Sequence, residues 1–152
     1  MTKPARPNRR DARRHAFHLI FQFPYHNAWG PEALAAATAN YYDGLEDEER
    51  PRGRDAAYVL RAVTGTWDRL PQLDGVIQTF LKNWTPERLN RVDLALMRLA
   101  IYEMLCEKDV PHGVAINESI ELAKDYGSDD SPAFIHGVLS NVSRAYEGSG
   151  LE

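Results

Sequence analysis

The sequence holds only one cysteine in 152 residues and no long uninterrupted run of apolar residues. Cys106 cannot form an internal disulfide, and its place in an apolar helical pattern predicts a small core residue in a reducing cytoplasm. No apolar stretch approaches the about 20 residues that cross a bilayer, so we expect no membrane span. The apolar residues after the basic N-terminus are interrupted by His18 and Gln22 and lack a small-residue cleavage site, which argues against a signal peptide.

Recognisable catalytic and metal-binding motifs are also missing. The sequence contains no glycine-rich phosphate loop and no GxSxG elbow. Its histidines show neither the HExxH spacing nor a pairing with cysteine at zinc-finger intervals. These histidines are His15, His18, His26, His112 and His136. We therefore expect no enzyme, no metal site and no bound cofactor.

Charge is distributed unevenly along the chain. Six of the first fourteen residues are basic and only Asp11 is acidic, so this arm carries +5, whereas the remaining residues hold 12 basic against 21 acidic side chains, a balance of −9. A basic arm on an acidic body predicts a localised binding surface for an anion, with RNA or DNA phosphate as the first candidate. The competing interpretation is a solvated, disordered terminus whose charge has no ligand.

Apolar residues recur at helical spacing over nearly the whole chain, and no segment shows a useful alternating β-pattern. We therefore expect an all-α fold with about seven helices in one domain. The predicted helices cover residues 9–23, 31–43, 55–70, 73–81, 85–106, 116–126 and 131–142. The segment LNRVDLALMRLAIYEMLC is so apolar that the fifth helix should lie at the centre of the core. The acidic run at 46–49 is typical of an exposed loop.

Three local signals make these helices specific enough to test. Thr85-Pro86-Glu87 combines a capping hydroxyl, a proline at the first position and an acid, which predicts a helix start. Gly127 follows the sixth helix and is expected to adopt the left-handed conformation of a C′ residue. The third helix should turn one face inward, made of Ala56, Leu60, Val63 and Trp67.

Arg98 and Glu103 are unexpected charges within the most apolar helix. They lie five residues apart and do not share a helix face, so each should contact a partner elsewhere. For Arg98 that partner is either an anionic ligand or a structural acid. For Glu103 a structural hydrogen bond is the favoured interpretation.

The start of the last helix is a second candidate site. Residues 128–132 present carboxylates and backbone N–H groups, and Phe134 and His136 follow them. An aromatic ring beside a helix N-terminus can stack on an unpaired base while carboxylates accept hydrogen bonds from base amino groups. From the residues alone, the favoured interpretation is a capped helix whose Phe134 belongs to the core.

Several blocks of the sequence resemble the bacterial transcription antitermination factor NusB. In order and spacing they are RVDLALMRLAIYEML, DVP, VAINESIELAKDYG and SPAFIHGVL, preceded by the opening helix RRDARRHAFHLIFQF. The resemblance covers essentially the whole chain and is strongest from about 84 to 142. It implies one domain over residues 1–152 built of two small helical bundles, about 8–82 and 84–146, with flexible ends at 1–7 and 147–152.

The same resemblance implies a non-catalytic cytoplasmic protein. Members of this family bind the boxA element of nascent ribosomal RNA as a heterodimer with ribosomal protein S10, and the pair joins an antitermination complex on RNA polymerase. Carried over by position, the RNA-binding residues are Arg6, Arg9, Arg10, Arg13, Phe21, Arg98, Asp130, Phe134 and His136. Relatives often have Val-Asn-Gly where this chain has residues 135–137, and a lysine where it has Ala133. Losing that lysine should weaken RNA binding modestly.

Three other interpretations stay open. One is the RNA-binding appendage of a ribosomal RNA cytosine methyltransferase, whose N-terminal domain resembles this fold. Another is a helical module that binds only protein and whose arginine arm is incidental. The third is self-association, because apolar surface reserved for S10 can pair with a second copy and form a homodimer when S10 is absent.

Overall fold

The computed structural model describes residues 8–24, 29–81 and 84–147. These residues form seven α-helices and two short 3₁₀ turns, and no strand is present among them, so the predicted all-α class is confirmed. The helices are α1 (Arg9–Phe21), α2 (Pro31–Asp43), α3 (Gly53–Asp68), α4 (Leu70–Phe80), α5 (Arg91–Cys106), α6 (His112–Tyr126) and α7 (Ser131–Ala145). The turns are η1 (Asp47–Glu49), within the acidic run, and η2 (Pro86–Arg88).

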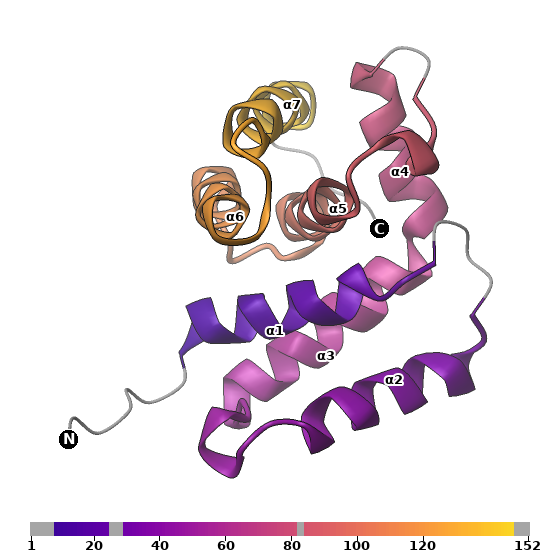
Figure 1. Cartoon of the computed structure of the whole chain (residues 1–152). Helices are drawn as coiled ribbons and strands as arrows, with labels where there is room; N and C mark the ends of the chain where they lie inside the picture. Colours follow the sequence, from indigo (N-terminus) through magenta and orange to yellow (C-terminus); the bar gives the residue numbers. More distant parts are fainter. Residues whose placement is uncertain (1–7, 25–28, 82–83, 148–152) are drawn as a thin grey trace.

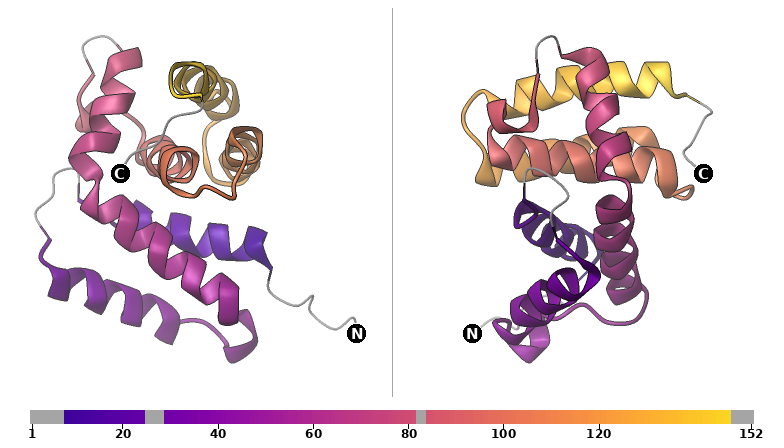
Figure 2. Two further views of the ribbon diagram at one scale, coloured as in Figure 1. Left: turned by 180° about the vertical axis from the view of Figure 1, so that it is seen from behind. Right: turned by 90° about the vertical axis from the view of Figure 1, so that its right-hand side faces the viewer.

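The helices are arranged in two groups that meet at α5. In Figure 1, α1, α2 and α3 form the lower group and α5, α6 and α7 the upper one. Helix α4 continues from the end of α3 and packs against α5 and α7, as the views in Figure 2 also show. Because α5 contacts α1, α3, α4, α6 and α7, it joins the two groups into one core.

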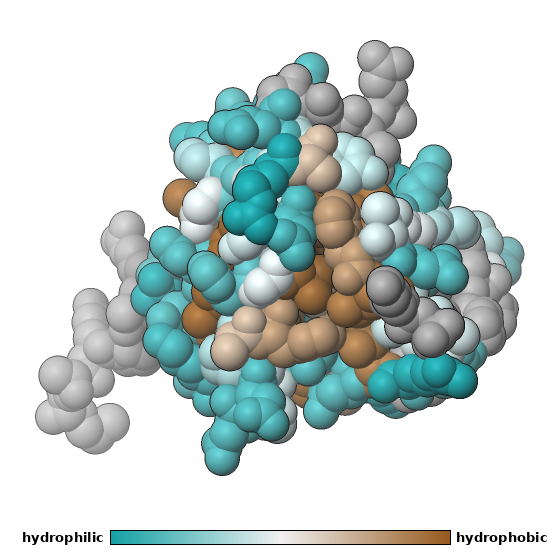
Figure 3. Space-filling model, turned by 90° about the horizontal axis from the view of Figure 1, so that it is seen from above, coloured by the Kyte–Doolittle hydropathy of each residue, from teal (hydrophilic) through white to brown (hydrophobic). Residues whose placement is uncertain are grey.

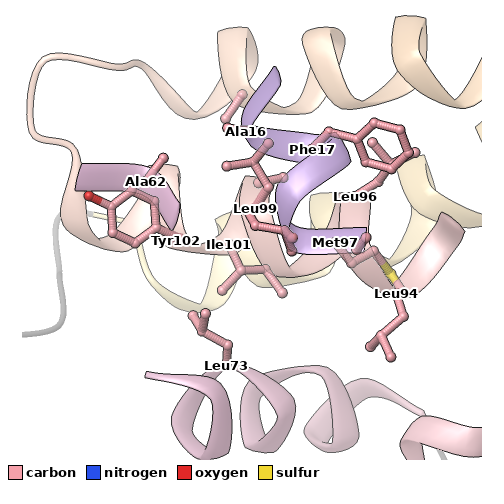
Figure 4. Packing of buried hydrophobic residues seen from close by; sticks show 14 of the residues in the cluster. Ala16, Phe17, Ala62, Leu73, Leu94, Leu96, Met97, Leu99, Ile101 and Tyr102 are labelled. Atoms are coloured by element: carbon pink, nitrogen blue, oxygen red, sulfur yellow. The ribbon is translucent and has the colours of Figure 1, made fainter. Parts of the chain in front are cut away.

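Helix α5 lies at the centre of the core, as its composition predicts. Every residue from Asp93 to Leu105 is buried. Figure 4 shows Leu99 and Leu96 on the side of α5 that faces Ala16 and Phe17 of α1, while Ile101 faces Leu73 of α4. A helix with apolar residues on most of its faces is removed from water only when other helices surround it. The burial of α5 therefore follows directly from its sequence.

Helix α1 begins at Arg9 because Asn8 forms a reciprocal cap with Asp11. The Asn8 side chain accepts a hydrogen bond from the Asp11 amide at 3.0 Å, and the Asp11 carboxylate accepts from the Asn8 amide at 3.2 Å. This arrangement satisfies two amides that no helical carbonyl reaches. It fixes the start of the arginine-bearing turns, and therefore the direction in which their side chains leave the helix.

The predicted helix start at Thr85-Pro86 is wrong by about one and a half turns. Pro86 opens only the short turn η2, and α5 starts at Arg91. The stronger cap is Asn90, whose side chain accepts from the amides of Val92 at 2.8 Å and Asp93 at 3.4 Å. A single asparagine that satisfies two otherwise unpaired amides outweighs the threonine signal before it.

The predicted left-handed conformation of Gly127 is also wrong. Its φ is −94°, which any residue adopts. Glycine is needed here for space, because a Cβ atom would lie 2.6 Å from Oγ of Ser131 and 2.9 Å from the carbonyl oxygen of Ala123. Ser131 is held in that place by the amide of Ser128, which donates to its Oγ at 3.0 Å. The glycine therefore allows the start of α7 to fold back tightly against the end of α6.

The buried face of α3 is rotated from the predicted one. Val63 and Trp67 are buried as expected, but Leu60 is 66% exposed and Val59 is buried instead. This difference comes from the packing of the neighbouring helices. Helices α1 and α5 pack over the side of α3 that carries Val59, whereas α2 lies too far from α3 to cover Leu60.

The outer surface carries apolar areas as well as charge. Figure 3, which looks down on α4 and α7, shows a hydrophobic area between these helices surrounded by hydrophilic side chains. In the part of the chain that the structure describes, no helix combines the length and apolarity needed to cross a membrane.

Candidate nucleic-acid interface

Three arginines in the first turns of α1 have side chains that are exposed to solvent. The side chains of Arg9, Arg10 and Arg14 are 37%, 67% and 42% exposed. Each forms an ion pair, Arg9 with Asp55 at 3.0 Å, Arg10 with Glu118 at 2.9 Å, and Arg14 with Asp11 at 3.0 Å. The three guanidinium groups stay partly exposed in these pairs, so a phosphate group can compete with the carboxylates for their hydrogen-bond donors.

Arg13 is not part of this exposed row, contrary to its sequence assignment. Its guanidinium binds the Glu103 carboxylate through Nε at 2.8 Å and Nη2 at 2.9 Å, and its side chain is 6% exposed. The Tyr58 hydroxyl donates to the same carboxylate at 2.6 Å. Burial disfavours the charge on Arg13, but the hydrogen bonds and charge of Glu103 outweigh it and raise the arginine pKa. Arg13 therefore joins α1 to α5 and is unavailable to a surface ligand.

Arg98 is likewise a structural residue in this conformation. It is 2% exposed, and its Nε and Nη2 donate to the two carboxylate oxygens of Asp74 at 2.8 and 2.7 Å. This pair joins α5 to α4. The prediction that Arg98 and Glu103 each contact a partner elsewhere is confirmed, and for both charges that partner is structural.

An aromatic strip lies on the C-terminal half of α1, and we define it as His18, Phe21 and Tyr126. Tyr126 comes from the end of α6, is 39% exposed, and places its ring centroid 5.0 Å from that of His18. Its hydroxyl lies 3.3 Å from Nε2 of His18. Burial, then the neighbouring His15 and Arg14, lowers the pKa of His18, which favours a neutral imidazole within the strip.

Phe21 forms the far end of the aromatic strip and is half-buried. The guanidinium of Arg91 lies 4.9 Å from the centre of its ring, and Nη2 of Arg91 donates to the Phe21 carbonyl oxygen at 2.9 Å. A cation held over an aromatic face is a common arrangement beside RNA, where a base can stack on either group.

The start of α7 lies beside the end of the aromatic strip. Tyr126 contacts α1 at Phe17 and His18 and precedes Asp130 by only four residues. Asp130 is exposed, and its carboxylate forms no capping hydrogen bond. His136 is also exposed, whereas Phe134 is half-buried and packs partly against the core, so its ring is only partly available to a ligand.

The structure thus brings only part of the predicted set together. Arg10 pairs with Glu118 of α6, and Tyr126 of the same helix contacts α1 at Phe17 and His18, one turn before Phe21. Arg9 instead faces α3 through Asp55, and Arg6 lies outside the described residues. The sequence missed Arg14, Tyr126 and Arg91. A signal for Arg14 was present, because Arg13 shares the helix face of Ala16 and Ile20, which turns Arg14 outward. Tyr126 and Arg91 reach the surface through contacts with α1 that no local pattern encodes.

No cluster of three or more histidine, cysteine, aspartate or glutamate side chains suited to a metal ion occurs among the described residues. The exposed groups of this surface are guanidinium ions, aromatic rings and carboxylates. Such groups can hold phosphates, stack on bases and accept hydrogen bonds.

Comparison with known proteins places this arrangement in a family. The model of the NusB family matches residues 10–144. The "Transcription antitermination protein NusB" of Nitratidesulfovibrio vulgaris (Miyazaki F) is 38% identical over 154 residues, which cover 96% of this chain and 93% of that protein. The protein of the same name from Clostridium botulinum (Loch Maree) is 38% identical over 143 residues, covering 89% of this chain and 99% of that protein.

Solved structures agree with this relationship. A NusB structure from T. maritima superposes with a TM-score of 0.78 at 31% identity, covering 92% of this chain and 93% of that one. A structure of the antitermination factors NusB and NusE with double-stranded RNA matches with a TM-score of 0.72 at 23% identity, over 91% and 97% of the two chains, and supports the fold. The chain belongs to the NusB family.

Proposed function

We propose that this protein is a non-catalytic, cytoplasmic transcription antitermination factor that binds boxA-type single-stranded RNA of nascent ribosomal transcripts together with ribosomal protein S10, within an antitermination complex on RNA polymerase. The observation that carries the proposal is the exposed arginine row of α1 beside an aromatic strip and an open helix start. The relatives from Nitratidesulfovibrio vulgaris and Clostridium botulinum are named as antitermination proteins, which favours this function over the methyltransferase appendage.

In this proposal the RNA backbone lies along the first turns of α1. Arg9, Arg10 and Arg14 exchange their carboxylate partners for phosphate oxygens and set the register of the strand. Unpaired bases then stack on Phe21 and Tyr126, because aromatic faces accept any base. Selectivity comes from the α7 start, where Asp130 accepts hydrogen bonds from base amino groups and His136 donates or accepts.

A basic partner protein fits the charge of this chain. Outside the arm the chain carries −9, so it repels RNA everywhere except near α1. S10 docked beside the arm adds positive surface and strengthens RNA binding. A NusB structure of the same fold contains NusE, the S10 protein, and RNA, which supports this partner. The hydrophobic area between α4 and α7 offers surface for a protein contact, and a homodimer in the absence of S10 stays an alternative use of it.

The test is the salt dependence of RNA binding, measured by fluorescence anisotropy with a labelled boxA-type single strand. Neutralising Arg9, Arg10 and Arg14 to glutamine should weaken binding and reduce the log–log salt slope by about 2, at about 0.7 for each phosphate contact. The control changes Arg52 and Arg144 to glutamine, which are exposed and lie outside α1. An equal loss of slope per arginine in the two variants would refute the arginine row as the RNA site.

The partner is tested by adding S10 to the same titration. We expect S10 to tighten RNA binding at physiological salt and to be retained by the protein in a pull-down, more strongly with RNA than without it. If the chain alone binds as tightly as its mixture with S10, the role assigned to the partner is wrong. A strictly protein-binding module would retain S10 but show no saturable RNA binding.

A further inference from the structure

A groove with a volume of about 750 Å³ runs between α2 and α3, and neither the RNA surface nor the α4–α7 face includes it. Its walls are apolar. The principal lining residues are Leu34, Ala35, Ala39 and Tyr42 of α2 and Leu60 and Val63 of α3. Helices α2 and α3 lie in the lower part of Figure 1, and Trp67 is a further lining residue of the groove.

The groove exists because α2 is only loosely attached to the rest of the fold. No residue of α2 is buried. The helix is held to α1 through His15, whose Nδ1 lies 2.5 Å from the Tyr41 hydroxyl and whose Nε2 lies 3.0 Å from the Glu49 carbonyl oxygen. Ala35, Ala39 and Leu60 therefore stay exposed on the two walls. Two helices with apolar residues facing an open groove form an incomplete helical bundle.

Opposite charges mark the two ends of the groove. Arg50 lies just before the start of α3, and Asp68 is the last residue of that helix, so the length of α3, about 24 Å for its sixteen residues, separates them. The Nε atom of Arg50 is buried and has no hydrogen-bond partner among the described residues. Its Nη2 reaches only the Leu45 carbonyl oxygen, at 3.4 Å. A buried donor without an acceptor is costly, so a ligand that supplies one is favoured.

We propose that this groove binds an amphipathic α-helix of a partner protein, about four turns long, with its N-terminus at Asp68 and an acidic last turn at Arg50. The orientation follows from charge, because the positive end of the helix dipole meets the carboxylate of Asp68 and an acidic side chain pairs with the guanidinium of Arg50. The bound helix runs antiparallel to α3. With α1, α2 and α3 it completes a four-helix arrangement.

The helical class of the partner follows from the walls. Both are α-helices whose backbone groups are already paired, so the groove offers no edge to which an extended strand can add. Contacts must come from side chains, and an apolar stripe at i, i+3, i+4 and i+7 matches a groove between two helices. A lipid with one anionic head group could pair with Arg50 but would offer no positive group to the carboxylate of Asp68.

The groove and the RNA surface can be occupied together. The RNA surface uses α1, α6 and the start of α7, whereas α2 lies at the opposite end of the molecule from α7 (Figure 1). The inference is therefore independent of the RNA proposal, and variants in the groove should bind boxA-type RNA like the unchanged protein.

The experiment uses two synthetic, side-chain-stapled peptides of about 14 residues with leucines at the i, i+3, i+4 and i+7 spacing. One carries lysine in its first turn and glutamate in its last, and the other has these charges exchanged. Binding to the full-length protein is followed by calorimetry and by amide NMR shifts. We expect the first peptide to bind about tenfold more tightly than the second, with shifts confined to α2 and α3.

Three variants decide the outcome. Arg50→Gln should abolish the preference between the peptides, and Leu60→Glu should abolish binding of both without unfolding an already exposed position. Val114→Glu, at an exposed apolar position on α6, is the matched control and should change nothing. The inference fails if neither peptide saturates, if the unchanged protein shows no charge preference, or if Leu60→Glu and Val114→Glu behave alike.

Discussion

Arg13 of α1 and Glu103 of α5 form a buried, bidentate ion pair across the boundary between the two helical groups, with N–O distances of 2.8 and 2.9 Å. Tyr58 of α3 adds a third helix to the same carboxylate. The pair makes Arg13 a structural residue, although its place in the basic N-terminal arm predicts an RNA contact. Because both partners are buried, removing one of them should change the free energy of unfolding by a measurable amount.

Removing the acid should be more damaging than replacing the pair. Glu103→Ala leaves the Arg13 charge buried and unpaired, so we expect the free energy of unfolding in urea to fall by about 3–5 kcal/mol. The double variant Arg13→Met, Glu103→Leu should lose less than this single change. Glu121→Ala, which breaks an exposed pair with Lys124, is the control and should stay within about 0.5 kcal/mol. Equal losses for Glu103→Ala and Glu121→Ala would contradict the structure.

Arg98 should affect stability and not RNA recognition. Asp74→Ala removes the carboxylate that accepts two hydrogen bonds from the Arg98 guanidinium, which is 2% exposed, and should lower the free energy of unfolding by about 3 kcal/mol. RNA affinity, measured by anisotropy at a temperature where the variant is folded by circular dichroism, should stay within about twofold. If the variant lost RNA binding but kept its stability, Arg98 would be an RNA-binding residue after all.

Two helical glycines should respond in opposite directions to alanine. At Gly65 an added Cβ atom overlaps the ring of Tyr102, so Gly65→Ala should destabilise by about 1–3 kcal/mol through overpacking. At Gly75, inside α4, a Cβ atom meets nothing within 4 Å, and Gly75→Ala should stabilise by about 0.5–1 kcal/mol. Thermal or urea unfolding distinguishes them, and a stabilising Gly65→Ala would show that α3 and α5 are less closely packed.

Stability should fall on mild acidification because of His15. Burial is the main cause that lowers the pKa of His15 below 6.5, so the unfolded chain takes up a proton more readily than the folded one. The contribution is fully present above the unfolded value and is lost as the pH falls through it. Urea unfolding at about pH 7.5 and about pH 5.5 should show this loss. In the double variant His15→Gln, His18→Gln the difference should shrink, and an unchanged difference would assign it to carboxylates.

Tyr126 should contribute to RNA binding through its ring and not its hydroxyl. Tyr126→Ala should weaken binding of a boxA-type strand by about 1–3 kcal/mol, the usual range for one stacked base. Tyr126→Phe keeps the ring and should bind like the unchanged protein. If both variants lose the same affinity, the hydroxyl contact with His18 is what matters, and the stacking role is wrong.

Helix identity and the central place of α5 were accessible from the sequence because they rest on local periodicity and composition. The predictions were wrong where burial or exposure of a side chain depends on a contact between helices that are far apart in the sequence. Leu60 has the spacing of a buried residue, yet its exposure depends on how far α2 stands from α3. Arg13 and Arg14 are adjacent and chemically identical. The helix face of Arg13 could be predicted, but its buried partner, the Glu103 carboxylate ninety residues later, could not.

That separation has a consequence for how the protein is made. Arg13 emerges from the ribosome long before Glu103 exists, so α1 cannot neutralise its buried charge until α5 has been synthesised. The N-terminal helices therefore lack their central packing partner until α5 is made, and during that time Arg13 has no Glu103 to pair with beside a ribosome made largely of RNA. Closure of the fold by α5 withdraws Arg13 from that environment and leaves Arg9, Arg10 and Arg14 outside.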